Sequence, residues 1–254
     1  MDVGIGLLGL FVGLLVGATG VGGASLLTPL LIMFGINPSI AVGTDLLYNS
    51  VTKLFGAAQH FKQKTIDLPM VKYFAYGSIP GAVVAVLTLH FMESFFNNQE
   101  QLIKNALGVV LIITAVATLY RQLFQHKVKE NRIQLLPLEQ KRGMTIAIGA
   151  VLGFIVGLTS IGSGSLYALA MIYLYQMNAS KVVGTDIAHA FLLVTAAGAM
   201  HAGMGNIDYS LALNLMIGSI PGVLIGSKLA VILPSRPLRT IMATLILISG
   251  LKLI

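Results

Sequence analysis

Two glycine-rich segments, residues 17–25 and 157–165, interrupt apolar stretches of the chain at matching places. A break of this kind in a membrane helix exposes backbone N–H groups at the start of the next half-helix, where the helix dipole adds positive charge. Such a site can bind an anion without a charged side chain, and serine and threonine hydroxyls add donors. The alternative is that the small residues only let helices pack closely. The substrate-binding residues predicted here are Thr19, Gly20, Gly22, Gly23, Ser25, Thr159, Ser160, Gly162, Ser163, Gly164 and Ser165.

A Gly-Thr-Asp motif follows each glycine-rich segment, at residues 43–45 and again at 184–186. A carboxylate inside a membrane span is costly and is commonly functional. Three roles stay open for the paired Asp45 and Asp186: proton coupling, anchoring of the broken segments, and stabilisation of a helix N-terminus. The neighbouring Thr44 and Thr185 are predicted to bind substrate.

The helix that follows the first motif carries polar residues at every fourth position. Asp45, Asn49 and Lys53 form one stripe, which favours Asn49 as a substrate ligand, and Tyr48 lies on a neighbouring stripe. Lys53 could neutralise Asp45, attract the anion, or extend to the membrane interface. In the second copy His189 takes the place of Tyr48, and apolar residues replace Asn49 and Lys53. The binding path is therefore expected to be asymmetric, with His189 as its titratable candidate.

The two motifs belong to an internal repeat. The sequence NPSIAVGTD at 37–45 returns as NASKVVGTD at 178–186, and GSIPG at 77–81 returns at 218–222. Both matches have an offset of 141, and 15 of the 49 ungapped positions from 37 to 85 are identical. The glycine-rich segments match at an offset of 140. Ser39 and Ser180, at equivalent positions, are interpreted as the N-caps of the repeated helix. The chain therefore consists of two related halves.

Composition assigns these halves to a membrane. Hydrophobic residues make up 56% of the 254 residues and charged residues only 10%, whereas a soluble domain carries about 25% charged residues. The 28 glycines suit close helix packing and broken helices in lipid. The predicted fold is an all-α polytopic membrane protein with two inverted-topology repeats that contain broken or re-entrant helices.

The distribution of charge orients the repeats. The central segment 122–142 is rich in lysine and arginine and is expected in the cytoplasm. Loop 61–68 carries Lys62 and Lys64, which places it inside, whereas the equivalent loop 203–208 carries only Asp208, which places it outside. Equivalent loops on opposite faces indicate inverted topology, a hallmark of secondary transporters. The expected organisation is a first transmembrane repeat at 1–121, a basic cytoplasmic linker at 122–142 and a second repeat at 143–254.

Several kinds of chemistry have no support in the sequence. The chain has no cysteine, no nucleotide-binding glycine loop and no metal-ligand spacing, so we expect no cofactor and no metal. No nucleophile with an adjacent base is visible, so catalytic residues are not predicted. The net charge of +7 gathers in loops between apolar runs and predicts no nucleic acid partner. The expected partners are a small anionic substrate, the lipid bilayer and, as an option, a second copy in a homodimer.

The paired glycine-rich turns, the repeated Gly-Thr-Asp and the repeated Gly-Ser-Ile-Pro-Gly resemble the TauE/SafE sulfite exporter family of bacterial permeases. The likeness covers nearly the whole chain. It implies a multi-pass protein of the bacterial inner membrane that moves a small sulfur oxyanion such as sulfite, with export as the expected direction and alternating access as the mechanism. Two alternatives stay open: a proton- or sodium-coupled cation carrier that uses Asp45 and Asp186, and an anion channel.

Overall fold

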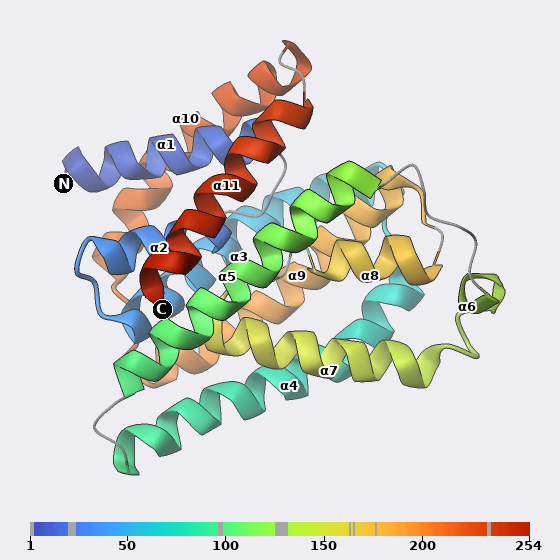
Figure 1. The fold of residues 1–254 in the computed structure, drawn as a ribbon, viewed down its shortest axis with the longest axis horizontal. Helices are drawn as coiled ribbons and strands as arrows, with labels where there is room; N and C mark the ends of the chain where they lie inside the picture. Colours follow the sequence, from blue (N-terminus) through green and yellow to red (C-terminus); the bar gives the residue numbers. More distant parts are fainter. Residues whose placement is uncertain are drawn as a thin grey trace.

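The computed structural model describes residues 3–19, 24–95, 99–124, 132–162, 164, 166–175, 177–232 and 235–254. Within these ranges the chain is helical, with turns and short loops between the helices (Figure 1). The helices of the first half are α1 (Val3–Thr19), α2 (Ala24–Met33), α3 (Pro38–Lys62), α4 (Leu68–Phe95) and α5 (Gln99–Phe124). The short α6 (Arg132–Leu135) leads to α7 (Arg142–Thr159), α8 (Leu166–Tyr175), α9 (Ala179–Gly203), α10 (Tyr209–Ile232) and α11 (Ser235–Leu253).

The predicted all-α membrane class is confirmed. Five of the described helices contain segments long and apolar enough to cross a membrane: 68–91, 103–120, 142–159, 180–203 and 209–226. Their outward faces carry exposed apolar side chains such as Phe91, Ile113 and Leu224. A water-soluble protein rarely exposes so much contiguous apolar surface, so these faces are suited to lipid.

The N-caps of the repeated helix differ from the sequence interpretation. The caps of α3 and α9 are Asn37 and Asn178, and not Ser39 and Ser180. The Asn37 side chain accepts the N–H of Ser39 at 2.9 Å, and the Asn178 side chain accepts the N–H of Lys181 at 2.9 Å. In α3 the proline at position 38 explains the earlier start, because proline favours the first helical position and restricts the residue before it to an extended backbone.

The first helix of each repeat packs along the fourth helix of the other repeat. Figure 1 shows α4 beside α7 and α1 beside α10. A Cβ atom added to Gly149 or Gly153 on α7 would collide with backbone atoms of Phe74 or Ser78 on α4. Because both pairs of contacts advance by four residues in the same direction, α4 and α7 run parallel. Small residues allow helix backbones to approach this closely in membranes.

The α1–α10 pair repeats this geometry residue by residue. Gly9 and Gly13 on α1 meet the backbone of Leu215 and Ser219 on α10. These four positions are the equivalents of Gly149, Gly153, Phe74 and Ser78 at the sequence offsets of 140 and 141. The repeated Gly-Ser-Ile-Pro-Gly motif therefore contributes to an interface between the two halves.

The central helices of the two repeats pack against their own equivalents. Ser50 on α3 hydrogen-bonds with Thr195 on α9 at 2.7 Å, and Gly56 approaches Ile187. Residue numbers rise on α3 as they fall on α9, so the two helices run antiparallel. In the α5–α11 pair Gly108 approaches Ile254 whereas Gly250 approaches Ile112, so these two helices are also antiparallel. Antiparallel packing of equivalent helices is compatible with inverted topology, which stays a prediction from the charged loops.

The second glycine-rich break is the tip of a helical hairpin. At the end of α8 the carbonyl oxygen of Leu174 accepts a hydrogen bond from Lys141 Nζ at 3.1 Å, and that of Tyr173 accepts one from Gln134 Nε2 at 2.8 Å. Lys141 is the N-cap of α7, so α8 ends where α7 begins. The 10 residues of α8 extend only about 15 Å, half of the hydrocarbon thickness. The α7–α8 pair is therefore a hairpin and not two complete crossings.

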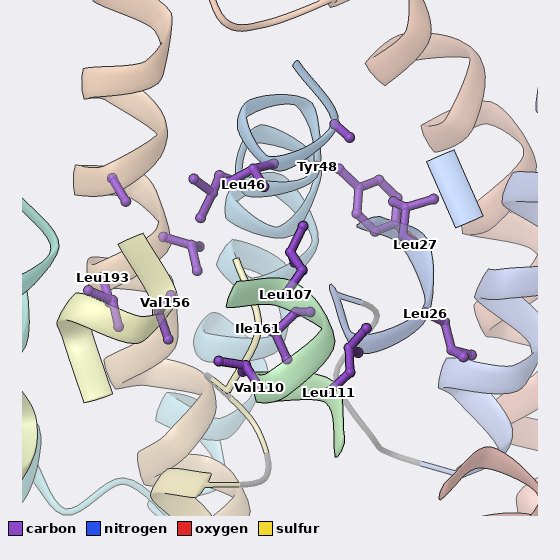
Figure 2. Packing of buried hydrophobic residues seen from close by; sticks show 14 of the residues in the cluster. Leu26, Leu27, Leu46, Tyr48, Leu107, Val110, Leu111, Val156, Ile161 and Leu193 are labelled. Carbon is purple, nitrogen blue, oxygen red and sulfur yellow. The ribbon is translucent and has the colours of Figure 1, made fainter. Parts of the chain in front are cut away.

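A shared apolar core holds the hairpin tip. Ile161, in the break itself, is fully buried and belongs to the cluster that contains Leu107 and Leu111 of α5 and Leu193 of α9. Figure 2 shows Ile161 among the α5 side chains, with Leu46 of α3 on the neighbouring helix. Burial of a side chain of this size is worth about 1.5–3 kcal/mol relative to an exposed position. The core therefore fixes the non-helical segment between the halves.

Candidate functional site

The backbone leaves the helical conformation at the end of α7 in two steps. Ser160 adopts a left-handed conformation with φ of 59° and donates its N–H to the carbonyl oxygen of Val156 at 2.7 Å. Gly162 then adopts φ of 110°, which side chains with a Cβ rarely tolerate. Its carbonyl oxygen accepts the N–H of Leu166 at 3.3 Å and so starts α8. The interruption predicted at residues 157–165 is thus present from Ser160 onward in the described part of the segment, whereas residues 157–159 still belong to α7.

The hydroxyl groups of the break bond to the protein itself. Thr159 Oγ1 donates to the carbonyl oxygen of Ile155 at 2.7 Å and accepts the N–H of Ile161 at 3.2 Å. Ser160 Oγ donates to Asp45 Oδ2 at 2.7 Å. Both threonine and serine are fully buried. In this conformation their hydroxyl hydrogens hold the hairpin tip, so that among Thr159, Ser160, Ile161, Gly162 and Gly164 the donors left for a ligand are backbone N–H groups.

Asp45 is the centre of a buried polar cluster that joins the two halves. Its Oδ2 accepts hydrogen bonds from Ser160 Oγ at 2.7 Å and from Thr28 Oγ1 on α2 at 2.8 Å. Its Oδ1 accepts Asn49 Nδ2 at 2.8 Å. The carboxylate is fully buried, and hydrogen bonds to a charged acceptor are stronger than neutral ones. These contacts correspond to the anchoring role among the three predicted for Asp45.

Thr28 is a member of this cluster that the sequence reasoning missed. It lies in the apolar helix α2, where the only signal was a polar residue between leucines and a proline. The repeat offset places Ala168 at the equivalent position, and Ala190 replaces Asn49. Two of the residues that donate to Asp45, Thr28 and Asn49, therefore have alanine at the equivalent positions of the second half.

Thr44 and Thr185 each hold the start of a helix from the opposite half. Thr185 Oγ1 accepts the N–H of Asp67 at 2.9 Å, and Thr44 Oγ1 accepts the N–H of Asp208 at 3.1 Å. The Asp67 and Asp208 side chains in turn cap α4 and α10. Both threonines are fully buried. These bonds give the threonine of each Gly-Thr-Asp motif a contact between the repeats, in addition to the substrate contact that the sequence predicts.

Replacement of these threonines by valine tests the inter-repeat contact. Valine keeps the shape but removes the acceptor, so one partly buried backbone N–H loses its partner in T44V and in T185V. We expect each variant to lower the free energy of unfolding by about 1–3 kcal/mol. The two bonds lie at separate positions, so the double variant should lose close to the sum. Thermal unfolding in detergent measures the change, and the exposed T88V, whose hydroxyl bonds within its own helix, is the control.

His189 lies in a second buried cluster, between α4, α8 and α9. Its Nε2 is 2.8 Å from Ser78 Oγ, and its ring centroid is 4.4 Å from that of Tyr167 and 5.6 Å from that of Phe74. His189 is fully buried, and its Nδ1 makes no hydrogen bond within the described part of the chain. At the equivalent position, Tyr48 interacts with Ser219, the counterpart of Ser78. The predicted correspondence of Tyr48 and His189 therefore extends to their partners.

Lys53 is within electrostatic range of the Asp45 and Asp186 carboxylates. It is half-buried on α3 and interacts electrostatically with Asp186 on α9, with Asp45 and with His189. Asp186 is itself buried. The structure thus brings the titratable candidates Asp45, Asp186, His189 and Lys53 into one region between the antiparallel helices α3 and α9.

Not every predicted substrate-binding residue lies in the described part of the chain. Gly20, Gly22, Gly23, Ser163 and Ser165 lie outside the described residues, as does the side chain of Thr19. Ser25 is buried at the start of α2, and Gly164 is half-buried in the turn before α8. No group of three or more histidine, cysteine, aspartate or glutamate side chains suited to a metal ion occurs in the described ranges.

Known proteins are similar to this chain along most of its length. The model of the family described as sulfite exporter TauE/SafE matches residues 5–253. The chain is 64% identical to the probable membrane transporter protein YjnA of Bacillus subtilis (strain 168), over all of both chains. It is 24% identical to the probable membrane transporter protein YunE of the same organism, over 97% of this chain and 95% of that one. The probable membrane transporter protein YfcA of Escherichia coli (strain K12) is 23% identical over 92% and 82%.

No solved structure matches the chain. The family match spans nearly every residue, and it covers both glycine-rich segments and both copies of the Gly-Thr-Asp motif. The chain therefore belongs to the sulfite exporter TauE/SafE family, and it is a membrane transporter.

Proposed function

We propose that this transporter carries a small sulfur-containing oxyanion such as sulfite across the bacterial inner membrane, with export as its direction. The family description supplies the substrate class. Moving one negative charge outward across a membrane with a potential of about 100 mV, negative inside, releases about 2.3 kcal/mol. Export of an anion therefore needs no other energy source unless the outside concentration is high.

The observation that carries the proposal is the set of backbone donors at the tip of the α7–α8 hairpin. Gly162 is buried, and neither its N–H nor that of Gly164 makes a hydrogen bond within the described part of the chain. Buried N–H groups almost always have an acceptor. An oxyanion supplies several acceptor oxygens, and the N-terminal end of α8 adds a favourable dipole. The absence of a bulky side chain at Gly162 and Gly164 lets the oxygen approach the backbone.

Lys53 supports the same assignment through charge. A half-buried ammonium group lies between the halves, in electrostatic contact with both carboxylates. An arriving anion is attracted to this cation and competes with Asp45 and Asp186 for it. The hydrogen bonds from Thr28, Ser160 and Asn49 restrict the movement of the Asp45 carboxylate. The anion then binds beside a fixed negative charge and a cation that can reorient.

Alternating access would follow from the way the repeats interlock. The close backbone contacts join α1 to α10 and α4 to α7, so each tight pair takes one helix from each half. Separation of the two halves as rigid bodies would break these contacts. We therefore expect the α1–α10 and α4–α7 units to move relative to each other around the α3–α9 pair, and to expose the tip of the α7–α8 hairpin to one face of the membrane at a time.

A proton- or sodium-coupled cation carrier is the second candidate. The observation that favours it is the position of Lys53 in the electrostatic reach of two buried carboxylates. A cation arriving from one side could displace the lysine from Asp186 and be released when the lysine returns. The anion would then play no part in the cycle.

Flux measurements on purified protein in liposomes separate the candidates. Vesicles loaded with labelled sulfite are diluted into buffer with unlabelled sulfite, and with sodium or proton gradients of either sign. Saturable sulfite flux that is accelerated by sulfite on the opposite side supports an anion carrier. Sulfite flux that neither saturates nor responds to sulfite on the opposite side indicates a channel. Movement of sodium or protons without any sulfite flux would rule out the proposal in favour of the cation carrier.

A further inference from the structure

An apolar groove follows the outer face of the α4–α7 pair. It has a volume of about 560 Å³ and is lined by residues that include Tyr76, Gly77 and Val84 on α4 and Ile146, Ala150 and Phe154 on α7. Tyr76 and Val84 are more than half exposed, so the groove opens on the surface that faces lipid. From residue 76 to residue 84 it runs along α4 for about 12 Å. The shape and chemistry fit a hydrocarbon chain.

Two exposed cations lie at one end of this groove. Lys72 Nζ is 5.7 Å from the centroid of the Tyr76 ring, which lines the groove. Arg142 is exposed at the first residue of α7, one helical turn before the groove residue Ile146. Because α4 and α7 run parallel, both cations are at the N-terminal end of the groove. That end is on the cytoplasmic face in the topology predicted from the charged loops.

The equivalent face of the other pair lacks these features. At the repeat offsets, Leu213 stands in place of Lys72 and Asp2 in place of Arg142. Leu10 and Phe11 on α1 correspond to Ala150 and Val151 on α7, so bulkier residues occupy the matching positions. The two backbones pack alike, and at these positions the α4–α7 face carries cations and small residues where the α1–α10 face has other residue types. The difference is therefore in the side chains and not in the packing of the helices.

We propose that an anionic phospholipid of the cytoplasmic leaflet binds this groove. One acyl chain lies along the glycine-lined floor between α4 and α7, and the headgroup phosphate accepts hydrogen bonds from Lys72 and Arg142. Cations near the membrane surface attract anionic lipid, and arginine and lysine are well suited to phosphate. The bound lipid would stabilise the α4–α7 unit. This proposal does not depend on which ion is transported.

The test compares two lipids with identical acyl chains, phosphatidylglycerol and phosphatidylcholine, added to the purified full-length protein in a neutral detergent. A ligand that binds only the folded state raises the unfolding temperature. We expect phosphatidylglycerol to raise the midpoint by about 4 °C more than phosphatidylcholine. In K72Q/R142Q this difference should fall to less than half. The control K181Q/K252Q removes two exposed charges outside the groove and should keep the full difference.

A second variant tests the groove itself. A150L/V151F introduces side chains of the size found at Leu10 and Phe11, which the equivalent backbone accommodates. It should also remove the difference between the lipids, because the acyl chain loses its place. Each variant is compared with its own midpoint in phosphatidylcholine, so that a general loss of stability cancels. An undiminished difference in K72Q/R142Q would overturn the headgroup contact, and one in A150L/V151F would overturn the groove. Conversion of a dimer to a monomer by A150L/V151F, with the lipid difference intact, would assign the groove to a second copy instead.

Discussion

Substitution of Gly162 by valine should abolish sulfite flux while the protein still inserts into the membrane and folds. The backbone at this position has φ of 110°, and a residue with a Cβ is strained there by about 1–3 kcal/mol. The added Cβ would meet the Leu166 Cδ1 atom at 3.2 Å, which is the flexible end of a side chain, so the surrounding helices need not separate. The strain instead changes the direction of the N–H groups of Gly162 and Gly164. We expect at least a 100-fold loss of flux, because misplaced donors no longer converge on the anion.

The matched control for this variant is Gly143→Val. Gly143 lies in the same helix hairpin, in the first turn of α7, but a Cβ there meets no atom within 4 Å. Flux in liposomes and monodispersity in detergent are measured for both variants. G143V should transport close to the wild-type rate. Normal flux in G162V, at equal protein incorporation, would show that the hairpin tip does not bind the substrate.

Replacement of Asp45 by alanine should cause the largest loss of stability among the polar residues of the site. The Oδ1 and Oδ2 atoms accept hydrogen bonds from three buried donors on α2, α3 and the hairpin tip. Removal of the carboxylate leaves Thr28 and Ser160 without their buried acceptor, and each such loss costs about 1–3 kcal/mol. It also frees the tip from α2 and α3. We expect D45A to lower the free energy of unfolding by about 3–5 kcal/mol and to stop transport.

Smaller substitutions separate the contributions of the individual hydrogen bonds to the loss of stability expected for D45A. T28V and S160A each remove one donor while the carboxylate stays, so each should cost less than D45A. The sum for T28V and S160A need not equal the loss in D45A, because groups in one network are not additive. D45N retains the size of the side chain but replaces one acceptor oxygen with a donor, and should lie between the alanine variant and wild type. Thermal unfolding of D45A at the wild-type midpoint would show that the cluster does not anchor the tip.

The membrane class, the division into two halves and the location of the breaks follow directly from the amino-acid sequence. A charged fraction of 10% cannot cover the surface of a soluble domain of this size, and this conclusion needs no coordinates. The repeat is visible because Gly-Thr-Asp and Gly-Ser-Ile-Pro-Gly keep one register in both halves. The interruption of the helix near Gly162 can also be predicted from the sequence, because a helix does not continue easily through a run of glycine and serine.

Only the tertiary structure decided which residues form hydrogen bonds with these polar side chains. Thr44 and Thr185 look like polar residues that face a substrate, but their hydroxyls accept N–H groups from residues more than 100 positions away. The sequence of the apolar helix α2 does not mark Thr28 as a site residue. Thr28 donates a hydrogen bond to Asp45 only because α2 packs against α3. Hydrogen bonds are short and directional, so spacing along the chain limits which residues share a helix face but not what that face contacts.

The same physical limit applies to the hairpin and to the exchange of helices between halves. The apolar runs at 143–159 and 161–176 are compatible with two short crossings or with one hairpin, since hydrophobicity alone does not record direction. The hydrogen bond from Lys141, at the start of α7, to the last turn of α8 shows that α8 returns toward the start of α7. Likewise, the glycines of the repeat predicted close packing, but only their contacts showed that α7 packs on α4 and α1 on α10. Local sequence determined which segments are helical or broken, and the long-range packing of small residues decided how they assemble.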